Sequence, residues 1–139
     1  MDIEAAKKFM IDRSEQIINL FLTYQMIEMM LFMKLHLPDL PRMENRDDAL
    51  EVMNKQINSK TFNKLKNKYL KEFPDDDYGL KFDLETVAMQ RNSFMHSLWM
   101  VVALAQYDRA KTEKWTDIIL DDFDKQAHKL LDKIYKLPN

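Results

Sequence analysis

The sequence predicts an all-α protein: an antiparallel bundle of four to five helices forming a single domain over residues 1–139. Apolar residues recur at three- and four-residue spacing along almost the whole chain, which is the repeat of one helix face. The chain contains 1 glycine and 4 prolines, too few for the many tight turns of a sandwich, barrel or doubly wound sheet. No segment alternates convincingly with the two-residue period of a strand.

The first predicted helix runs from about Ile3 to about His36, where Pro38 ends it. One of its faces carries the apolar residues Ile17, Leu20, Phe21, Tyr24, Ile27, Met30 and Leu31. After a loop, Asp47 and Asp48 favour the first turn of a second helix, because carboxylates stabilise the positive end of a helix dipole. The buried side of this second helix is expected to hold Leu50, Met53 and Ile57.

A further helix, or a kinked continuation of the second, is predicted around Phe62, Leu65, Tyr69 and Phe73, with Ser59 or Thr61 as its cap. A break follows at residues 74–79, and Asp83 is expected to cap a helix over about Leu84–Tyr107. The short link at residues 108–111 predicts that the last helix, capped by Thr112, returns antiparallel. Its inner stripe would hold Trp115, Ile118, Ile119, Phe123, Leu130, Leu131 and Ile134.

Composition excludes several classes of protein. A phosphate-binding glycine loop needs more than the 1 glycine present, and the lack of cysteine excludes a disulfide scaffold, a thiolate zinc site and a cysteine nucleophile. Charged residues near the start argue against a signal peptide. The longest uncharged apolar run, Ser97–Ala105, is well short of the roughly 20 residues that span a bilayer. We therefore expect a soluble, cytoplasmic protein with no membrane association.

Three polar residues interrupt the most apolar predicted helix. Nearly every position from 87 to 105 is apolar or small, yet Arg91 and Asn92 lie there, and His96 follows. Arginine is almost never buried without a partner. Arg91 therefore either forms an ion pair in the core, with Glu28 as the candidate acid, or faces a polar cleft. The three side chains span an arc of about 140° on a helix, and a two-fold dimer through this apolar helix would bring two such arcs together.

Guanidinium, amide and imidazole together fit the cleavage of a phosphodiester. Histidine can take or give a proton near pH 7, and the planar fork of arginine holds phosphate oxygens. RNA supplies its own nucleophile, the ribose 2′-hydroxyl. This chemistry therefore needs no metal and no cofactor, and we expect none.

The stretch Arg-Asn-Ser-Phe-Met-His at positions 91–96 resembles the motif of HEPN domains, an arginine followed by four to six residues and a histidine. HEPN domains are small all-α proteins, mostly dimeric, and many are metal-independent endoribonucleases of toxin–antitoxin and phage-defence systems. The resemblance implies that Arg91 binds and stabilises the phosphate, that His96 transfers the proton, and that Asn92 orients His96 or the phosphate. It also implies an RNA substrate, a homodimer, and a cognate antitoxin or inhibitor protein as a candidate partner.

One position departs from a branch of this family. HEPN toxins that are inhibited by adenylylation carry tyrosine two residues after the histidine, and this chain has Leu98 there. The resemblance therefore does not extend to that form of inhibition. The alternative function is a non-catalytic helical domain that binds a protein or RNA partner. An enzyme needs Arg91 and His96 accessible in a cleft, whereas a scaffold would hold Arg91 against an acid such as Glu28.

Charge is unevenly distributed along a chain whose formal net charge is -2. A basic segment contains Lys60, Lys64, Lys66 and Lys68, with Phe62 and Tyr69 between them. It predicts either a track for an RNA backbone with stacked bases or a solvated helix face. The acids Glu113, Asp117 and Asp121 fall four apart, which predicts a solvated stripe that could also dock a basic partner. No ligands from other segments converge on them, so we expect no metal site.

Overall fold

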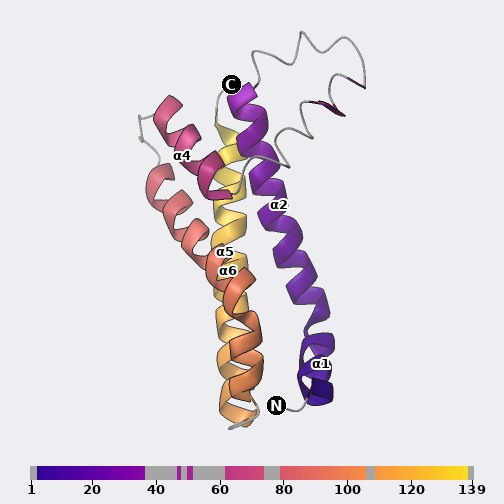
Figure 1. Ribbon diagram of the computed structural model, residues 1–139. Helices are drawn as coiled ribbons and strands as arrows, with labels where there is room; N and C mark the ends of the chain where they lie inside the picture. Colours follow the sequence, from indigo (N-terminus) through magenta and orange to yellow (C-terminus); the bar gives the residue numbers. More distant parts are fainter. Residues whose placement is uncertain are drawn as a thin grey trace.

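The computed structural model describes residues 3–36, 47, 50, 51, 62–73, 79–105 and 109–137. These residues form the helices α1 (Ile3–Asp12), α2 (Ser14–His36), α4 (Phe62–Glu72), α5 (Leu80–Ala105) and α6 (Arg109–Lys136). No strand occurs among them, and the helices pack against one another as an elongated bundle (Figure 1). The prediction of an all-α helical bundle is thereby confirmed.

Helix α6 is the centre of the bundle, because it packs against both α5 and α2, while α4 lies against α2 and α5 at one end (Figure 1). The α5–α6 pair is antiparallel, as the short link between them predicts. Near the start of α5, Asp83 pairs with Lys133 near the end of α6, and further along α5 the Gln90 amide donates to Asp122 at 3.4 Å.

The α2–α6 pair runs in the same direction. Arg13, just before α2, binds Asp117 in the first third of α6 at 2.9 Å, and Lys34 near the end of α2 donates to the carbonyl oxygen of Leu137 at 2.9 Å. The bundle therefore contains a parallel pair of long helices beside the antiparallel pair, a detail that the predicted antiparallel bundle did not specify.

The core runs through all four longer helices. The predicted apolar face of the first segment is largely confirmed, since Leu20, Tyr24, Ile27 and Leu31 are each no more than 1% exposed. The other helices contribute Phe62, Leu65, Tyr69, Leu80, Leu84, Val87, Ala88, Phe94, Leu120, Ala127, Leu130 and Ile134. Apolar spacing of three and four residues therefore identified most of the core-facing side of α2, α4 and α6.

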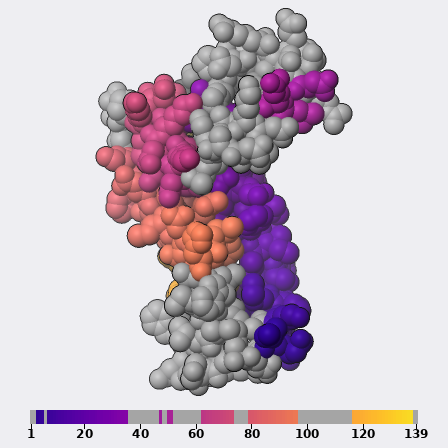
Figure 2. Space-filling view, in the orientation of Figure 1, coloured from indigo at the N-terminus to yellow at the C-terminus, as the bar shows by residue number. Residues whose placement is uncertain are grey.

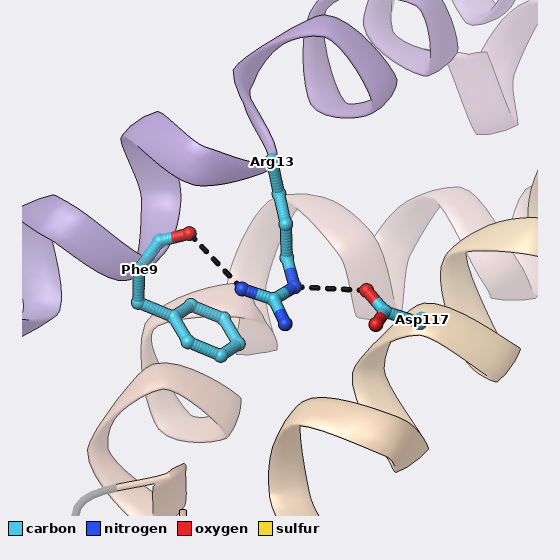
Figure 3. Close-up of polar contacts among 3 residues, drawn as sticks. All are labelled: Phe9, Arg13 and Asp117. Carbon is cyan, nitrogen blue, oxygen red and sulfur yellow. Dashed lines mark hydrogen bonds and ion pairs between the residues drawn. The ribbon is translucent and has the colours of Figure 1, made fainter.

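The expectation of one unbroken helix from Ile3 to His36 is wrong, because the chain breaks at Arg13 between α1 and α2. The Arg13 amide bonds to the carbonyl of Met10, three residues back, instead of four. Its side chain packs over the Phe9 ring, with Cζ 3.9 Å from the ring centroid, and its Nε donates to Asp117 (Figure 3). A contact with a distant helix thus fixes a joint that the local sequence does not signal.

Two predicted helix starts are also wrong. α5 begins at Leu80, directly after Gly79, whose φ of 67° is readily accessible only to glycine. Asp83 therefore lies within the first turn and not at the N-cap position, and its buried carboxylate binds Lys133. α6 begins at Arg109, which places Thr112 inside the helix.

Three residues on the predicted apolar faces are exposed instead. Phe21, Leu50 and Ile118 are 38%, 42% and 57% exposed. Phe73, predicted within the third helical segment, follows the last residue of α4. The helix expected from Asp47 is represented only by residues 47, 50 and 51, which are helical; its other predicted core positions, Met53 and Ile57, lie outside the described residues.

Candidate functional site

Arg91 on α5 and Glu28 on α2 form an ion pair, with Nη2 of the guanidinium 2.9 Å from Oε1 of the carboxylate. The side chains are 22% and 27% exposed, so neither is sealed in the core. Of the two placements that the sequence allows for Arg91, the structure shows the ion pair with Glu28, but with both side chains partly exposed and not in the core. Burial raises the pKa of the Glu28 carboxyl above its ordinary value, and the charge and hydrogen bond of Arg91 lower it in part.

Aromatic residues surround this pair. The Arg91 guanidinium lies over the ring of Phe62, the first residue of α4, at 5.4 Å from the ring centroid. Tyr24, one turn before Glu28 on α2, packs against Phe94, three residues after Arg91 on α5, with ring centroids 5.7 Å apart. The ion pair thus marks the point where α2, α4 and α5 meet.

The hydroxyl of Tyr24 is buried and has no hydrogen-bond partner among the described residues. Burial raises the pKa of Tyr24 above its ordinary range, while the charge of Arg91 lowers it and that of Asp124 raises it. Sequence reasoning assigned Tyr24 to the core but missed the position of its hydroxyl near both charges. No local pattern marks this arrangement, because it depends on three helices.

Asn92 and His96, the other two residues of the motif, are more exposed the further they lie along α5. Asn92 is half-buried, and His96 is exposed to solvent. His96 lies about 140° around the helix from Arg91 and about 7.5 Å further along its axis. One chain therefore brings Arg91 and Glu28 into contact, while His96 faces a different direction.

The described lysines of the basic segment are only partly exposed to solvent. Of the four predicted RNA-binding lysines, Lys64 is exposed, Lys66 and Lys68 are half-buried on α4, and Lys60 lies outside the described residues. Phe62 and Tyr69 are 1% and 4% exposed, so their rings face the core and are closed to stacking with bases. A role for α4 in RNA binding would therefore rest on its charges.

The acidic stripe on α6 has partners within the chain. Asp117 binds Arg13, and Asp121 binds Lys125 one turn later at 3.0 Å. Glu113 lies on the helix, but its side chain is outside the described residues. The basic group that Asp117 binds belongs to the same chain, and docking of a basic partner by this stripe stays a prediction. In the described part of the chain, no three His, Cys, Asp or Glu side chains are grouped so as to hold a metal ion.

One helix of the described part, over Ser14–Leu35, is long and apolar enough to cross a membrane. The longest uncharged apolar run in the sequence lies elsewhere, because Glu28 interrupts the apolar residues of this helix. The pairing of Glu28 with Arg91 and the bond from Lys34 to Leu137 hold this helix against the bundle.

No family model, curated protein or solved structure matches this chain. The resemblance to HEPN domains therefore rests on the residues at positions 91–96 and on the helical fold.

Proposed function

We propose that this chain is a metal-independent endoribonuclease of the HEPN type, acting as a toxin or abortive-infection effector in the cytoplasm. The observation that supports this proposal is the open placement of the motif on α5. Arg91 is partly exposed with its guanidinium oriented by Glu28, Asn92 is half-buried, and His96 is exposed. A motif that served packing alone would be expected to lie in the core.

In the proposed reaction, the His96 imidazole removes the proton of a ribose 2′-hydroxyl, and the 2′ oxygen attacks the adjacent phosphorus. The bond from phosphorus to the 5′ oxygen breaks, and an acid on the opposite side of the phosphorus from His96 supplies the proton that this oxygen gains. The products are a 2′,3′-cyclic phosphate and a 5′-hydroxyl. Arg91 stabilises the negative charge on the pentacovalent phosphorus, and Asn92 orients His96 or the phosphate.

Glu28 acts as a positioning residue in this proposal. A guanidinium carries five N–H donors in a rigid plane, and an ion pair through Nη2 leaves other donors of the plane for phosphate oxygens. The Phe62 ring beneath it restricts rotation of that plane. Lysine at position 91 would keep the charge but lose the planar contact with both neighbours.

The second candidate function is a non-catalytic interaction domain. It is favoured by the same ion pair, because Glu28 neutralises Arg91 within a single chain. A guanidinium whose charge is already balanced attracts a phosphate less strongly than a free one. The two candidates therefore differ in whether Arg91 exchanges part of its contact with Glu28 for a phosphate.

The test is an incubation of purified protein with single-stranded and structured RNAs in excess chelator. We expect cleavage to 2′,3′-cyclic phosphate ends, no cleavage of DNA, and a loss of roughly 10²- to 10⁴-fold in His96→Ala. Arg91→Ala should lose a comparable factor, with poor rescue by Arg91→Lys. The matched control is His128→Ala, because His128 is also exposed on a helix and pairs with Asp124 at 3.3 Å.

Wild-type protein that leaves all of these RNAs intact would favour the interaction domain. The same conclusion would follow if His96→Ala and His128→Ala had equal activity. Circular dichroism of each variant separates loss of chemistry from loss of fold.

A further inference from the structure

Helix α2 carries a continuous apolar stripe on its outer side, away from the bundle. Its members are 41–55% exposed: Ile18, Leu22, Met26, Met29 and Met33. At 100° per residue, they fall within an arc of about 80°, opposite the face that holds Leu20 and Ile27, and they extend about 22 Å along the axis. Figure 2 shows α2 as a long strip at one edge of the molecule.

The stripe contains no charge. Between positions 16 and 33, α2 has a single charged residue, Glu28, which binds Arg91 at about 120° around the helix from the centre of the stripe. Half-exposed side chains of this size each present on the order of 100 Å² of apolar surface, or roughly 500 Å² together. This is near the upper end of what monomeric soluble proteins expose, which indicates a partner.

The order of the residues indicates which partner. Ile18 and Met33 lie equally far from a point between positions 25 and 26, and so do Leu22 and Met29. If two copies of α2 pack antiparallel around a two-fold axis through this point, Ile18 meets Met33 and Leu22 meets Met29 of the other copy. Met26 lies half a residue from the axis, where it meets Met26 of the other copy, so all five side chains of the stripe have an apolar neighbour across the pairing.

We propose that the α2 stripe is the contact surface for a second copy of this chain, in this antiparallel register. Two stripes would bury about 1,000 Å², which reaches the size of a specific interface. Exposed Glu15 disfavours the parallel register, where the two Glu15 carboxylates would meet on the stripe side of the helices. The antiparallel register separates them by about 30 Å along the axis.

The sequence predicts a dimer interface on α5, whose side chains from position 97 onward lie outside the described residues. In the described part of α5, the exposed apolar residues Phe82 and Met89 alternate with exposed Glu85 and Ser93, so that face is mixed, whereas the α2 stripe is wholly apolar. The proposed pairing places the two Arg91–Glu28 pairs on the same side of the dimer, because both lie at the same edge of the stripe. It does not depend on the proposed RNA cleavage and holds for either candidate function.

The first test uses charge exchange. Leu22→Glu and Met29→Lys should each convert a dimer into a 16.7 kDa monomer in light scattering at micromolar concentration. The double variant should dimerise again, because position 22 opposes position 29 of the other copy and opposite charges meet. A parallel pairing would set like charges together and give no rescue. Phe82→Lys, an equally drastic change at a more exposed position on α5, is the matched control and should stay dimeric.

The second test exploits the absence of native cysteine. A Met26→Cys variant should form an interchain disulfide on oxidation, since the two sulfurs lie beside the axis. Leu22→Cys alone should not, because its two copies are about 10 Å apart along the axis, whereas a mixture of Leu22→Cys with Met29→Cys should. These variants keep the proposal testable if a charged variant fails to fold.

Three results would overturn the proposal. One is a wild-type protein that is monomeric at micromolar concentration. Another is a dimer that persists in both Leu22→Glu and Met29→Lys while Phe82→Lys dissociates it. The third is a monomer that binds phosphatidylcholine and phosphatidylglycerol vesicles and loses that binding in Leu22→Glu, which would assign the stripe to a lipid surface. RNA cleavage is scored separately on each variant, so failure of the pairing and failure of the nuclease activity are distinguishable.

Discussion

Glu28 and Arg91 meet at 2.9 Å between α2 and α5, and each keeps about a quarter of its side chain exposed. A fully buried pair would suggest a role in stability alone, and a fully exposed pair would contribute little to it. The intermediate position keeps the guanidinium fixed and still reachable from solvent. The same ion pair can therefore orient Arg91 for a phosphate or stabilise the packing of α2 on α5.

The stability of the protein should carry a pH-dependent contribution from Glu28. Its folded-state pKa is raised by burial, so the folded protein holds the proton more strongly than the unfolded chain does. The associated stability is present at pH values below the ordinary glutamate pKa and is lost as the pH rises through the raised folded value. Urea unfolding across this pH range should show a falling free energy of unfolding in wild type and no such fall in Glu28→Gln.

Arg91→Ala provides a check on that prediction. Removing the guanidinium abolishes the two influences that lower the Glu28 pKa. The fall in the free energy of unfolding with rising pH should therefore occur at higher pH and become larger. If the free energy of unfolding fell equally with rising pH in wild type and Glu28→Gln, a titratable group other than Glu28 would be responsible.

Removal of the Tyr24 hydroxyl should cost little. The group is buried without a partner among the described residues, so Tyr24→Phe deletes an unsatisfied polar atom and keeps the ring contact with Phe94. We expect a free energy of unfolding within about 1 kcal/mol of wild type, or higher. Tyr24→Ala, which leaves a cavity, should lose about 3–5 kcal/mol. Denaturant titration of both variants measures the difference, and a large loss in Tyr24→Phe would reveal a partner for the hydroxyl.

Arg13→Ala should release α1 while leaving the rest of the bundle intact. The substitution removes both the ion pair with Asp117 and the packing over Phe9, together worth about 1–2 kcal/mol. Hydrogen exchange of the α1 amides should become faster, and exchange in α6 should be unchanged. The control is Lys7→Ala, whose ion pair with Glu4 is largely exposed. Equal effects of the two substitutions would show that Arg13 does not hold α1.

The α4 lysines should control RNA affinity through charge. If Lys64, Lys66 and Lys68 contact phosphates, changing all three to glutamine should weaken binding and lower the salt slope by about 2, from about 0.7 per contact on a single strand. The chemical step on bound RNA should persist, since these residues lie outside the motif. Fluorescence anisotropy at several salt concentrations measures the slope, with exposed Lys129→Gln as control. An unchanged slope would identify the segment as a solvated face.

The parts of the fold that could be predicted are the helices whose buried side is marked by the spacing of apolar residues. The spacing of Leu20, Tyr24 and Ile27 predicts a helix and its buried side, and the structure confirms both. The Arg91–Glu28 pair was predictable as well, because a charge within an apolar helix requires a partner and Glu28 is the only acid in its own apolar run.

The features that sequence reasoning missed depend on contacts between distant segments. The break at Arg13 follows from its bond to Asp117, and the start of α5 at Leu80 places Asp83 inside the first turn, where it binds Lys133. Phe62 faces Arg91 because α4 crosses the end of the bundle. Helical periodicity describes one helix at a time and contains no information on which helices become neighbours.

The parallel alignment of α2 and α6 has a consequence for synthesis of the chain. The contacts of Arg13 with Asp117 and of Lys34 with Leu137 span sequence separations of 104 and 103 residues. As the chain leaves the ribosome, α2 therefore emerges long before the helix against which it packs, and both of its apolar sides remain uncovered in the meantime. Packing of α2 must await the emergence of α6, so the nascent chain presents a ready binding site for a chaperone, and its folding rate should be limited by this late long-range closure.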